Sequence, residues 1–211
     1  FYCHEGCSVS LPLFDLLVII IMLTIAIALP FVYARVVLGG RRVALRPLKP
    51  LNHIDSALVR AAETGNPIHL APGAGALHGQ NIAPESLAGL MLTQRISDIA
   101  AKRGATVTVS SGDAVAHLAL RGVVRDTYRE AGYAEDYHPE AIQLFADHEP
   151  LAYAAGVGQR YRTEAMEASV AVGAFGDSFL LLGEQGRKYG VDQIGGTTNA
   201  SSLAASILTT N

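Results

Sequence analysis

Residues 66–104, NPIHLAPGAGALHGQNIAPESLAGLMLTQRISDIAAKRG, join a short apolar run, a loop of small residues and a long amphipathic segment. Apolar residues recur at helical spacing after Pro84, which suits the first position of a helix. Gly104 suits the left-handed residue that ends a helix. The stretch predicts a strand over 67–71, a loop, and a helix over 84–103.

The same alternation continues through residues 51–211, a length that suits one domain with its own core. The strand-like runs are continuous and apolar, as expected when both faces of a sheet are covered. Strands and helices in regular succession predict a Rossmann-like α/β domain with a mostly parallel sheet and helices on both faces. The expected strands cover residues 67–71, 106–110, 142–146, 169–174 and 191–194, and the expected helices 55–64, 84–103, 113–132, 177–190 and 201–210.

Right-handed crossovers place the carboxyl ends of these strands at one edge of the sheet, where open α/β sheets bind ligands. A glycine-containing turn, AAGVGQ at 154–159, is also expected before the fourth strand. Loops of this kind can wall a crevice for a nucleotide or a small acidic metabolite. The segments expected at the edge are PGAGALHG at 72–79, SSGD at 110–113, GAFGDS at 173–178 and GGTT at 195–198.

Four residues of this edge are candidate ligand-binding residues: Gly73, Gly75, His78 and Asp177. The specific patterns of phosphate-binding loops are missing. A P-loop would have lysine directly after Gly79, and the glycine spacing differs from the dinucleotide fingerprint. No serine lies in a G-x-S-x-G elbow. Tight turns and close helix–sheet packing explain the small residues more simply, and we favour that explanation over a ligand site.

No residue is assigned a catalytic role, and an enzymatic activity is not favoured. Asp113 and Asp177 each follow a strand end, where a catalytic acid can lie, but helix capping explains both more simply. His69 is expected to be a hydrogen-bonded histidine in the interior.

An acidic segment, 136–149, contains two histidines. His138 and His148 stand among carboxylates that could hold a divalent cation, although a solvated acidic turn is the favoured interpretation. The carboxylates are Asp136, Glu140, Asp147 and Glu149.

Residues 16–34, LLVIIIMLTIAIALPFVYA, carry no charge. As a helix, this run spans roughly 30 Å, about the thickness of the hydrocarbon core of a bilayer. A buried core helix seldom lacks a polar face over such a length, and the basic n-region of a signal peptide is missing. We therefore expect a transmembrane helix over 11–35, after an external segment over 1–10.

Five basic residues follow the apolar run within a linker-like segment, and no acidic residue interrupts them. They favour a single-pass protein of the cell membrane, with the N-terminus outside, the α/β domain in the cytoplasm and membrane lipids as partners. They are Arg35, Arg41, Arg42, Arg46 and Lys49, and the basic linker is expected over 36–50.

Residues 51–211 hold eleven Lys and Arg against seventeen Asp and Glu, a net charge of −6. This acidic balance, without clusters of basic and aromatic residues, argues against nucleic-acid binding.

Both cysteines lie near the N-terminus, in FYCHEGCS. In an external segment Cys3 and Cys7 are expected to form a small disulfide or to remain thiols. Together with His4 they also offer a redox or metal role, although a closed zinc site needs four ligands. No metal and no cofactor is assigned from the sequence.

The segments ALVRAAETGNPIHLAPGAGALHG, SLAGL, PLAYAAGV and SVAVGAFG resemble a family of uncharacterised bacterial membrane proteins, known only as a domain of unknown function. The resemblance covers most of residues 16–196. It implies an N-terminal membrane helix, a basic linker and a small-residue-rich α/β domain, and it implies no catalytic residue. Members often continue into further hydrophobic segments, so this chain is expected to be a shortened or divergent member.

These observations favour a membrane-anchored structural or assembly subunit that forms a homo-oligomer or joins a larger membrane complex. Ligand binding at the glycine-rich edge is the first alternative, and a redox or metal role of the Cys3, His4 and Cys7 segment is the second.

Overall fold

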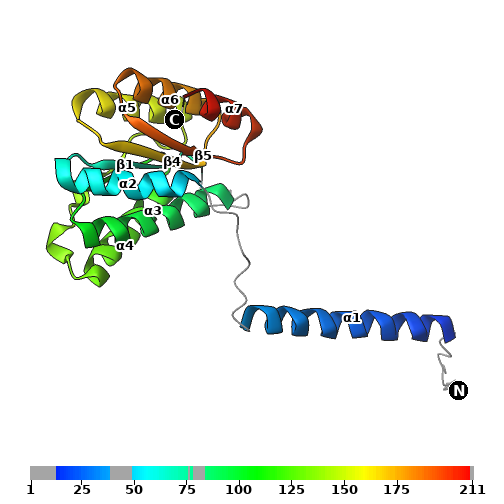
Figure 1. Cartoon of the computed structure of the whole chain (residues 1–211). Helices are drawn as coiled ribbons and strands as arrows, with labels where there is room; N and C mark the ends of the chain where they lie inside the picture. Colours follow the sequence, from blue (N-terminus) through cyan, green and yellow to red (C-terminus); the bar gives the residue numbers. More distant parts are fainter. Residues whose placement is uncertain (1–12, 39–48, 76, 78–83, 210–211) are drawn as a thin grey trace, which may run out of the picture. The chain divides into compact units, whose positions relative to one another are not determined.

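The computed structural model describes residues 13–38, 49–75, 77 and 84–209 (Figure 1). The chain divides into two units, Phe1–Pro47 and Leu48–Asn211. We describe each unit by itself. The external segment over 1–10 and most of the expected basic linker lie outside the described residues.

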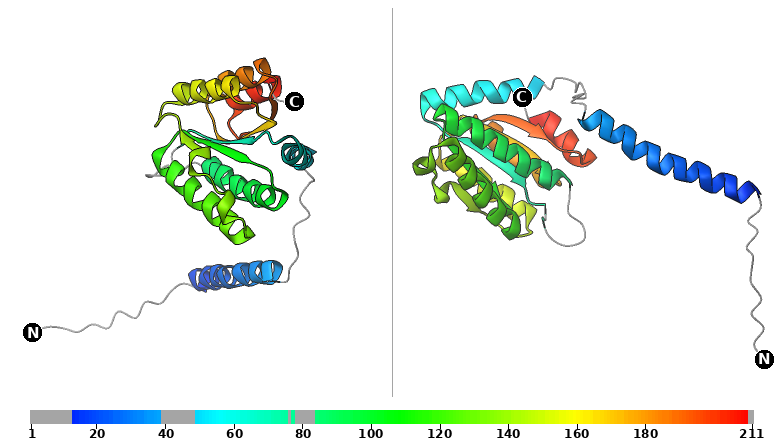
Figure 2. Two further views of the ribbon diagram at one scale, coloured as in Figure 1. Left: turned by 90° about the vertical axis from the view of Figure 1, so that its left-hand side faces the viewer. Right: turned by 90° about the horizontal axis from the view of Figure 1, so that it is seen from below.

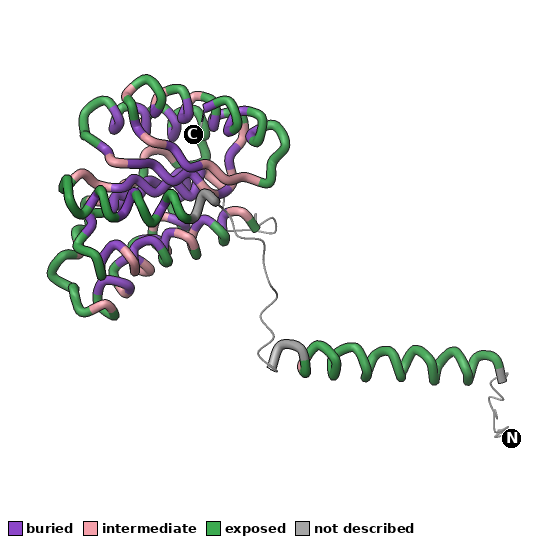
Figure 3. The backbone as a smooth tube through the Cα atoms, in the orientation of Figure 1, coloured by how far each residue is buried: buried purple, intermediate pink, exposed green. Residues whose placement is uncertain are grey.

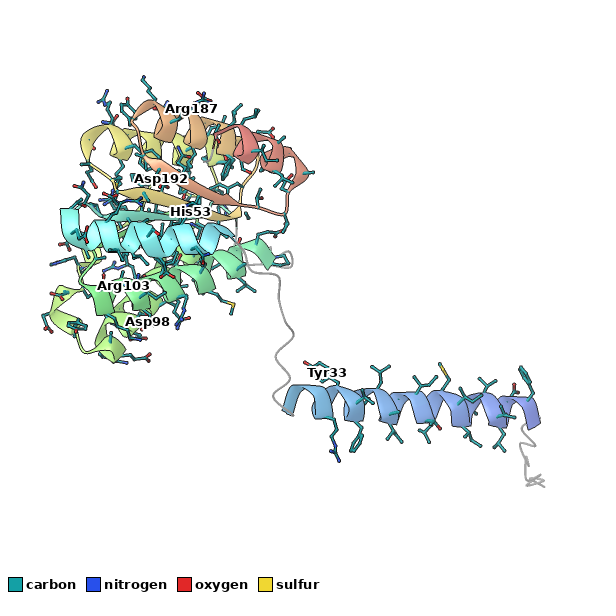
Figure 4. The ribbon with its side chains drawn as sticks, in the orientation of Figure 1. Tyr33, His53, Asp98, Arg103, Arg187 and Asp192 are labelled. Atoms are coloured by element: carbon teal, nitrogen blue, oxygen red, sulfur yellow. The ribbon has the colours of Figure 1, made fainter. Side chains whose placement is uncertain are left out.

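The first unit contains helix α1, Leu13–Leu38. Within it, Phe14–Arg35 has a mean hydropathy of 2.8, and none of that span is buried (Figure 3). The side chains of α1 project on all sides of the helix, Tyr33 among them (Figure 4). The helix is therefore long and apolar enough to cross a membrane, a property that a signal sequence can share.

The second unit is built on a five-stranded sheet in the order β3-β2-β1-β4-β5, with every neighbouring pair parallel. The Rossmann-like fold expected from the alternating pattern is confirmed. All five strands lie where the sequence predicts them, within two residues at each end. They are β1 Ile68–Gly73, β2 Val107–Ser111, β3 Ile142–Leu144, β4 Ala168–Ala174 and β5 Asp192–Gly196.

Helices cover both faces of the sheet, as Figures 1 and 2 show. Helices α2, α3 and α4 lie on one face, and α5, α6 and α7 lie on the other. Two single-turn 3-10 helices, Ala134–Asp136 and Pro139–Ala141, precede β3. The α-helices are α2 Lys49–Thr64, α3 Pro84–Arg103, α4 Ala114–Ala131, α5 Pro150–Thr163, α6 Ser178–Lys188 and α7 Ala200–Thr209.

Helix α3 begins at Pro84 and ends at Arg103, as predicted. Helix α4 also has the predicted ends: the Asp113 side chain accepts a hydrogen bond from the Ala116 N–H, and Gly132 ends the helix in the left-handed conformation. Helix α2 begins at Lys49, earlier than the expected residue 55. Arg60 of α2 forms an ion pair with Asp192 of β5.

Residues 154–159 are not a turn, which corrects the sequence interpretation. They lie inside α5, and its glycines allow close packing. A Cβ on Gly156 would lie 2.7 Å from the Phe145 ring, and one on Gly158 would lie 2.7 Å from Cγ of Gln185. Tertiary packing explains these glycines, so they do not wall an edge crevice.

The apolar core has two parts, one on each side of the sheet. Beneath α2–α4 the sheet contributes alternate residues such as Ile68, Leu70 and Val109, all at most 1% exposed. Beneath α5–α7 the core includes Tyr153 and Phe179, both fully buried. The carboxyl ends of the five parallel strands lie at one edge of this core, and Gly73, Gly75 and Asp177 are at or near that edge.

Candidate functional site

The order of the strands creates a switch point between β1 and β4. The chain passes from β1 towards β2 and from β4 towards β5, so the loops after β1 and β4 diverge. Open α/β sheets bind ligands in the crevice formed at such a point, outside the carboxyl ends of the strands. The edge predicted from the sequence is therefore the place to look for a site.

Two adjoining clefts open at this edge, with volumes of about 360 Å³ and about 300 Å³. Both have Glu85 and Thr197 in their walls. The larger cleft is lined by Ala74, Gly75, Glu85, Pro150, Ala174, Phe175, Gly176, Ser178, Thr197 and Asn199. The smaller is lined by Pro84, Glu85, Ala88, Val172, Gly173, Gly196, Thr197 and Thr198.

The lining carries one charged group among the residues that the structure describes, the carboxylate of Glu85. Its Oε1 accepts a hydrogen bond from the Thr198 hydroxyl, which links the first turn of α3 to the loop between β5 and α7. This bond is the main reason that the pKa of Glu85 is lowered, followed by a backbone hydrogen bond. Glu85 is therefore a negative group between the two clefts at neutral pH.

Helix N-termini surround the larger cleft. The Asn199 side chain caps α7 by accepting a hydrogen bond from the Ser201 N–H, and its amide donates to the Phe175 carbonyl. Glu149 and Asp177 stand at the N-cap positions of α5 and α6, and neither side chain makes a capping bond. The capping role expected for Asp177 is therefore wrong, because its backbone is already helical, with φ −62° and ψ −21°. These two acids add negative charge near the cleft.

The predicted glycines permit a close approach between the ends of β1 and β4. Gly73 has a φ of +92°, and a Cβ there would collide with the Ala174 carbonyl. A Cβ on Gly75 would collide with the Ala174 side chain and lie 2.5 Å from the Ser86 hydroxyl oxygen. Both glycines are thus needed for packing, and Gly75 also lines the larger cleft.

The other candidate residues have different locations. Asp177 is exposed before α6 and does not line either cleft, whereas its neighbours Gly176 and Ser178 line the larger one. His78, Cys3 and Cys7 lie outside the described residues. Thr198 lies in the segment 195–198 that the sequence predicts at this edge, but the sequence pattern did not indicate Glu85 or Asn199, because only the fold brings the three together.

A second polar group lies at the ends of β2 and β3. Nε2 of His148 is 3.6 Å from carboxylate oxygens of both Asp113 and Asp147, and the three possible ligand atoms lie within 4.8 Å of one another. Asp113 and Asp147 also accept hydrogen bonds from the Ala116 and Ala114 N–H groups. The carboxylates therefore stabilise the start of α4, which confirms the capping interpretation of Asp113.

His138 does not belong to that group, and its Nδ1 lies 3.5 Å from Oε1 of Glu140. His69, by contrast, is fully buried and hydrogen-bonded, as expected. Its Nδ1 lies 3.0 Å from the Tyr161 hydroxyl, and its Nε2 lies 3.0 Å from the Ser110 hydroxyl. Burial lowers the pKa of His69 to about 3, helped by the charge of Arg160, so this histidine is neutral at pH 7.

Helix α7 presents its polar side to the protein and its apolar side to solvent. Ser202, Ser206 and Thr209 are buried, and Ser202 donates to the Phe175 carbonyl. Ile207 and Leu208 are 72% and 70% exposed. A surface helix of a globular domain normally has the opposite arrangement. We call the exposed side the α7 face, and it consists of Ala200, Leu203, Ala204, Ile207 and Leu208.

A comparison with known proteins identifies the family to which this domain belongs. The model of a domain of unknown function, DUF6754, matches residues 8–210 of the chain. The chain belongs to the DUF6754 family. The match includes α1 and every element of the α/β unit, so both clefts and the α7 face are parts of the DUF6754 domain. No curated protein and no solved structure matches the chain.

Proposed function

We propose that the chain is a membrane-anchored assembly subunit whose α/β domain pairs with a second copy of itself through the α7 face. In this proposal α1 crosses the cell membrane once, with the N-terminus outside and the α/β domain in the cytoplasm. The basic residues after the apolar span support this orientation.

The α7 face carries the proposal. Leu203, Ile207 and Leu208 are 47%, 72% and 70% exposed at spacings that place them on one side of the helix. Small residues fill the buried side: the would-be Cβ of Gly183 overlaps the Thr209 side chain, so α6 and α7 pack closely. The helix therefore cannot rotate its large apolar residues inward without losing this fit.

Charge favours a second copy over a lipid surface as the partner of the α7 face. No charged residue occurs from Gln193 to Asn211, whereas interfacial membrane helices carry Lys and Arg beside their apolar face. Residues 51–211 have a net charge of −6, which opposes attachment to anionic lipids. Protein interfaces, in contrast, have few charges at their centres.

Anchoring by α1 allows a small interface on α7 to hold two copies together. One ten-residue helix face buries less area than the roughly 1,600 Å² of a typical stable interface. Confinement of two chains to one membrane raises their effective concentration, so that a weak contact becomes occupied. The α7 face and α1 then act together.

A matched pair of charge substitutions tests the α7 face. Ile207→Glu on α7 and Leu118→Glu on α4 change residues of nearly equal exposure, 72% and 69%, so neither disturbs the core. The full chain in detergent micelles would be followed by analytical ultracentrifugation. We expect Ile207→Glu to raise the dimer dissociation constant by roughly tenfold or more, and Leu118→Glu to leave it unchanged.

Crosslinking in lipid nanodiscs separates pairing through α7 from pairing through α1. In a Cys3→Ser, Cys7→Ser background, Ala204→Cys places a thiol near the middle of α7, and Val115→Cys places one on α4. A two-fold contact between α7 helices predicts a disulfide dimer with Ala204→Cys alone. The absence of a disulfide dimer with Ala204→Cys in nanodiscs, or a dimer that Ile207→Glu does not weaken, would contradict the proposal.

A further inference from the structure

We propose that the clefts at the switch point bind a small uncharged molecule with a vicinal diol, such as a ribonucleoside or a sugar, through the carboxylate of Glu85. This inference goes beyond the assembly role and does not depend on it. It also differs in chemistry from the acidic metabolite that the glycine-rich loops suggest, because the charges around the site differ from those of a phosphate-binding loop.

The size and walls of the clefts suit such a ligand. Each cleft has a volume of 300 Å³ or somewhat more, at the lower end of ligand sites. Pro84, Val172 and Phe175 supply apolar walls, and Thr197 and Asn199 supply polar groups. Mostly apolar walls with a few converging polar groups are typical of small-molecule sites.

The charges of the described lining favour an uncharged ligand over an anion. No Lys, Arg or His of the described residues lines either cleft, and Glu85 is charged there. Glu149 and Asp177, at the N-cap positions of α5 and α6, also weaken the positive potential of these helix ends. These negative groups disfavour a phosphate, whereas hydroxyl groups donate favourably to a carboxylate.

Glu85 is held where it can accept such hydrogen bonds. Its bond from Thr198 fixes the side chain between the two clefts. A carboxylate offers about four lone-pair positions, so this bond leaves capacity for the two adjacent hydroxyls of a diol. The arrangement therefore places a diol at Glu85 and leaves the apolar walls for the rest of the ligand.

A second observation comes from Ser86, the next residue of α3. Ser86 is 4% exposed, and its hydroxyl has no hydrogen-bond partner among the described residues. The hydroxyl lies against Gly75, which lines the larger cleft. Ser86 itself lines neither cleft. An unpartnered buried hydroxyl costs free energy, so a polar ligand group that reaches past Gly75 would gain a hydrogen bond there.

Two pairs of variants test the site. Glu85→Gln keeps the shape of the side chain and removes its charge, and Glu140→Gln makes the same change at an exposed site. Gly176→Leu adds a large apolar side chain to the lining of the larger cleft, and nothing lies within 4 Å of a Cβ there. Gly122→Leu is the same change on α4, away from both clefts, where a Cβ also has nothing within 4 Å. Ser86→Ala should leave the stability of the free protein unchanged or raise it.

The full chain in detergent micelles would be titrated by calorimetry with ribonucleosides, their 2′-deoxy analogues, their 5′-monophosphates, ribose and glucose. We expect a diol compound to bind in the micromolar to millimolar range. Binding should weaken when the ligand loses its 2′-hydroxyl or gains a phosphate. It should also weaken in the variants Glu85→Gln, Ser86→Ala and Gly176→Leu, and the loss of the carboxylate charge should cost roughly 10- to 100-fold in affinity. Glu140→Gln and Gly122→Leu should not.

No binding of any diol compound at millimolar concentration would overturn the inference, as would tighter binding of the monophosphates. Binding that survives both Glu85→Gln and Gly176→Leu would place the ligand elsewhere and would also overturn it. The oligomeric state of Ile207→Glu is measured separately, so the failure of either proposal leaves the other standing.

Discussion

The two faces of the sheet use the same strands but hold their helices by different means. Towards α2–α4 the strands present Ile68, Leu70, Val109 and other aliphatic residues. Towards α5–α7 the alternate positions form a polar row, because Thr108, His69, Ser169 and Gln193 are register partners across β2, β1, β4 and β5. Each of these four residues is at most 5% exposed.

Hydrogen bonds join the polar row, and Ser110 two residues further along β2, to α5 and α6. Tyr161 of α5 lies 2.6 Å from the Ser169 hydroxyl, and Tyr153 lies 2.8 Å from the Ser110 hydroxyl. Gln193 donates to the Gly183 carbonyl of α6. Apolar burial on the first face is tolerant of small shifts, whereas buried hydrogen bonds on the second face require one arrangement. The second face therefore fixes where α5 and α6 lie, and with them the part of the larger cleft that Pro150 and Ser178 line.

The largest expected difference between the faces is their response to acid. Burial lowers the pKa of His69 to about 3, against an ordinary value of 6.5. Below pH 6.5 the unfolded chain binds a proton that the folded chain does not, so stability falls as the pH falls towards 3. The free energy of unfolding should drop by about 1.4 kcal/mol for each pH unit in this window.

Chemical denaturation of the α/β domain in the full chain between pH 7 and pH 4.5 would measure the slope, and histidine NMR would identify the residue. The His69 ring should remain neutral until the protein unfolds. A His69 ring that titrates near pH 6.5 in the folded protein would show that the polar row is open to water.

Glycine-to-alanine substitutions should act with opposite signs on the two faces. A Cβ on Gly186 of α6 would overlap the Gln193 amide, which is buried and hydrogen-bonded, so Gly186→Ala should destabilise the fold by about 1–3 kcal/mol. Gly122 of α4 has nothing within 4 Å of its would-be Cβ. Gly122→Ala should therefore stabilise the fold by about 1 kcal/mol through helix propensity. Urea unfolding at pH 7 measures both changes, and equal signs would contradict the proposed contrast.

The sequence was sufficient to predict the fold because its information is local. Each signal sets the local structure of a few neighbouring residues. Examples are the apolar runs, Pro84 at the start of α3 and Gly132 at the end of α4. The position of α5 was missed because Gly156 and Gly158 resemble turn residues, and their reason lies in contacts with Phe145 and Gln185. Helical glycines that serve tertiary packing have no local pattern.

The sequence predicted the location of the candidate site at the carboxyl edge of the sheet, but not most of the residues that form it. Gly75 and Thr198, both from segments expected at this edge, line the clefts, but Glu85 and Asn199 come from the starts of α3 and α7, which only the fold brings together. The α7 face was also not predicted. Alternating small polar and large apolar residues show the period of a helix, and nothing in that period tells which side faces the protein.

The smallest expected change in stability comes from removing one tyrosine hydroxyl group on each face of the sheet. Tyr161→Phe deprives His69 and Ser169 of a shared partner, although these two remain 3.1 Å apart and keep one hydrogen bond. The free energy of unfolding should fall by about 1 kcal/mol.

Tyr128 of α4 is buried on the opposite face at 6% exposure, and its pKa is raised to about 12, chiefly by burial. Tyr128→Phe should cost less than Tyr161→Phe, because its ring packs in an apolar cluster and no hydrogen-bonded row depends on it. Urea unfolding of the two variants would measure the difference. If the order were reversed, the polar row would not be what holds α5 to the sheet.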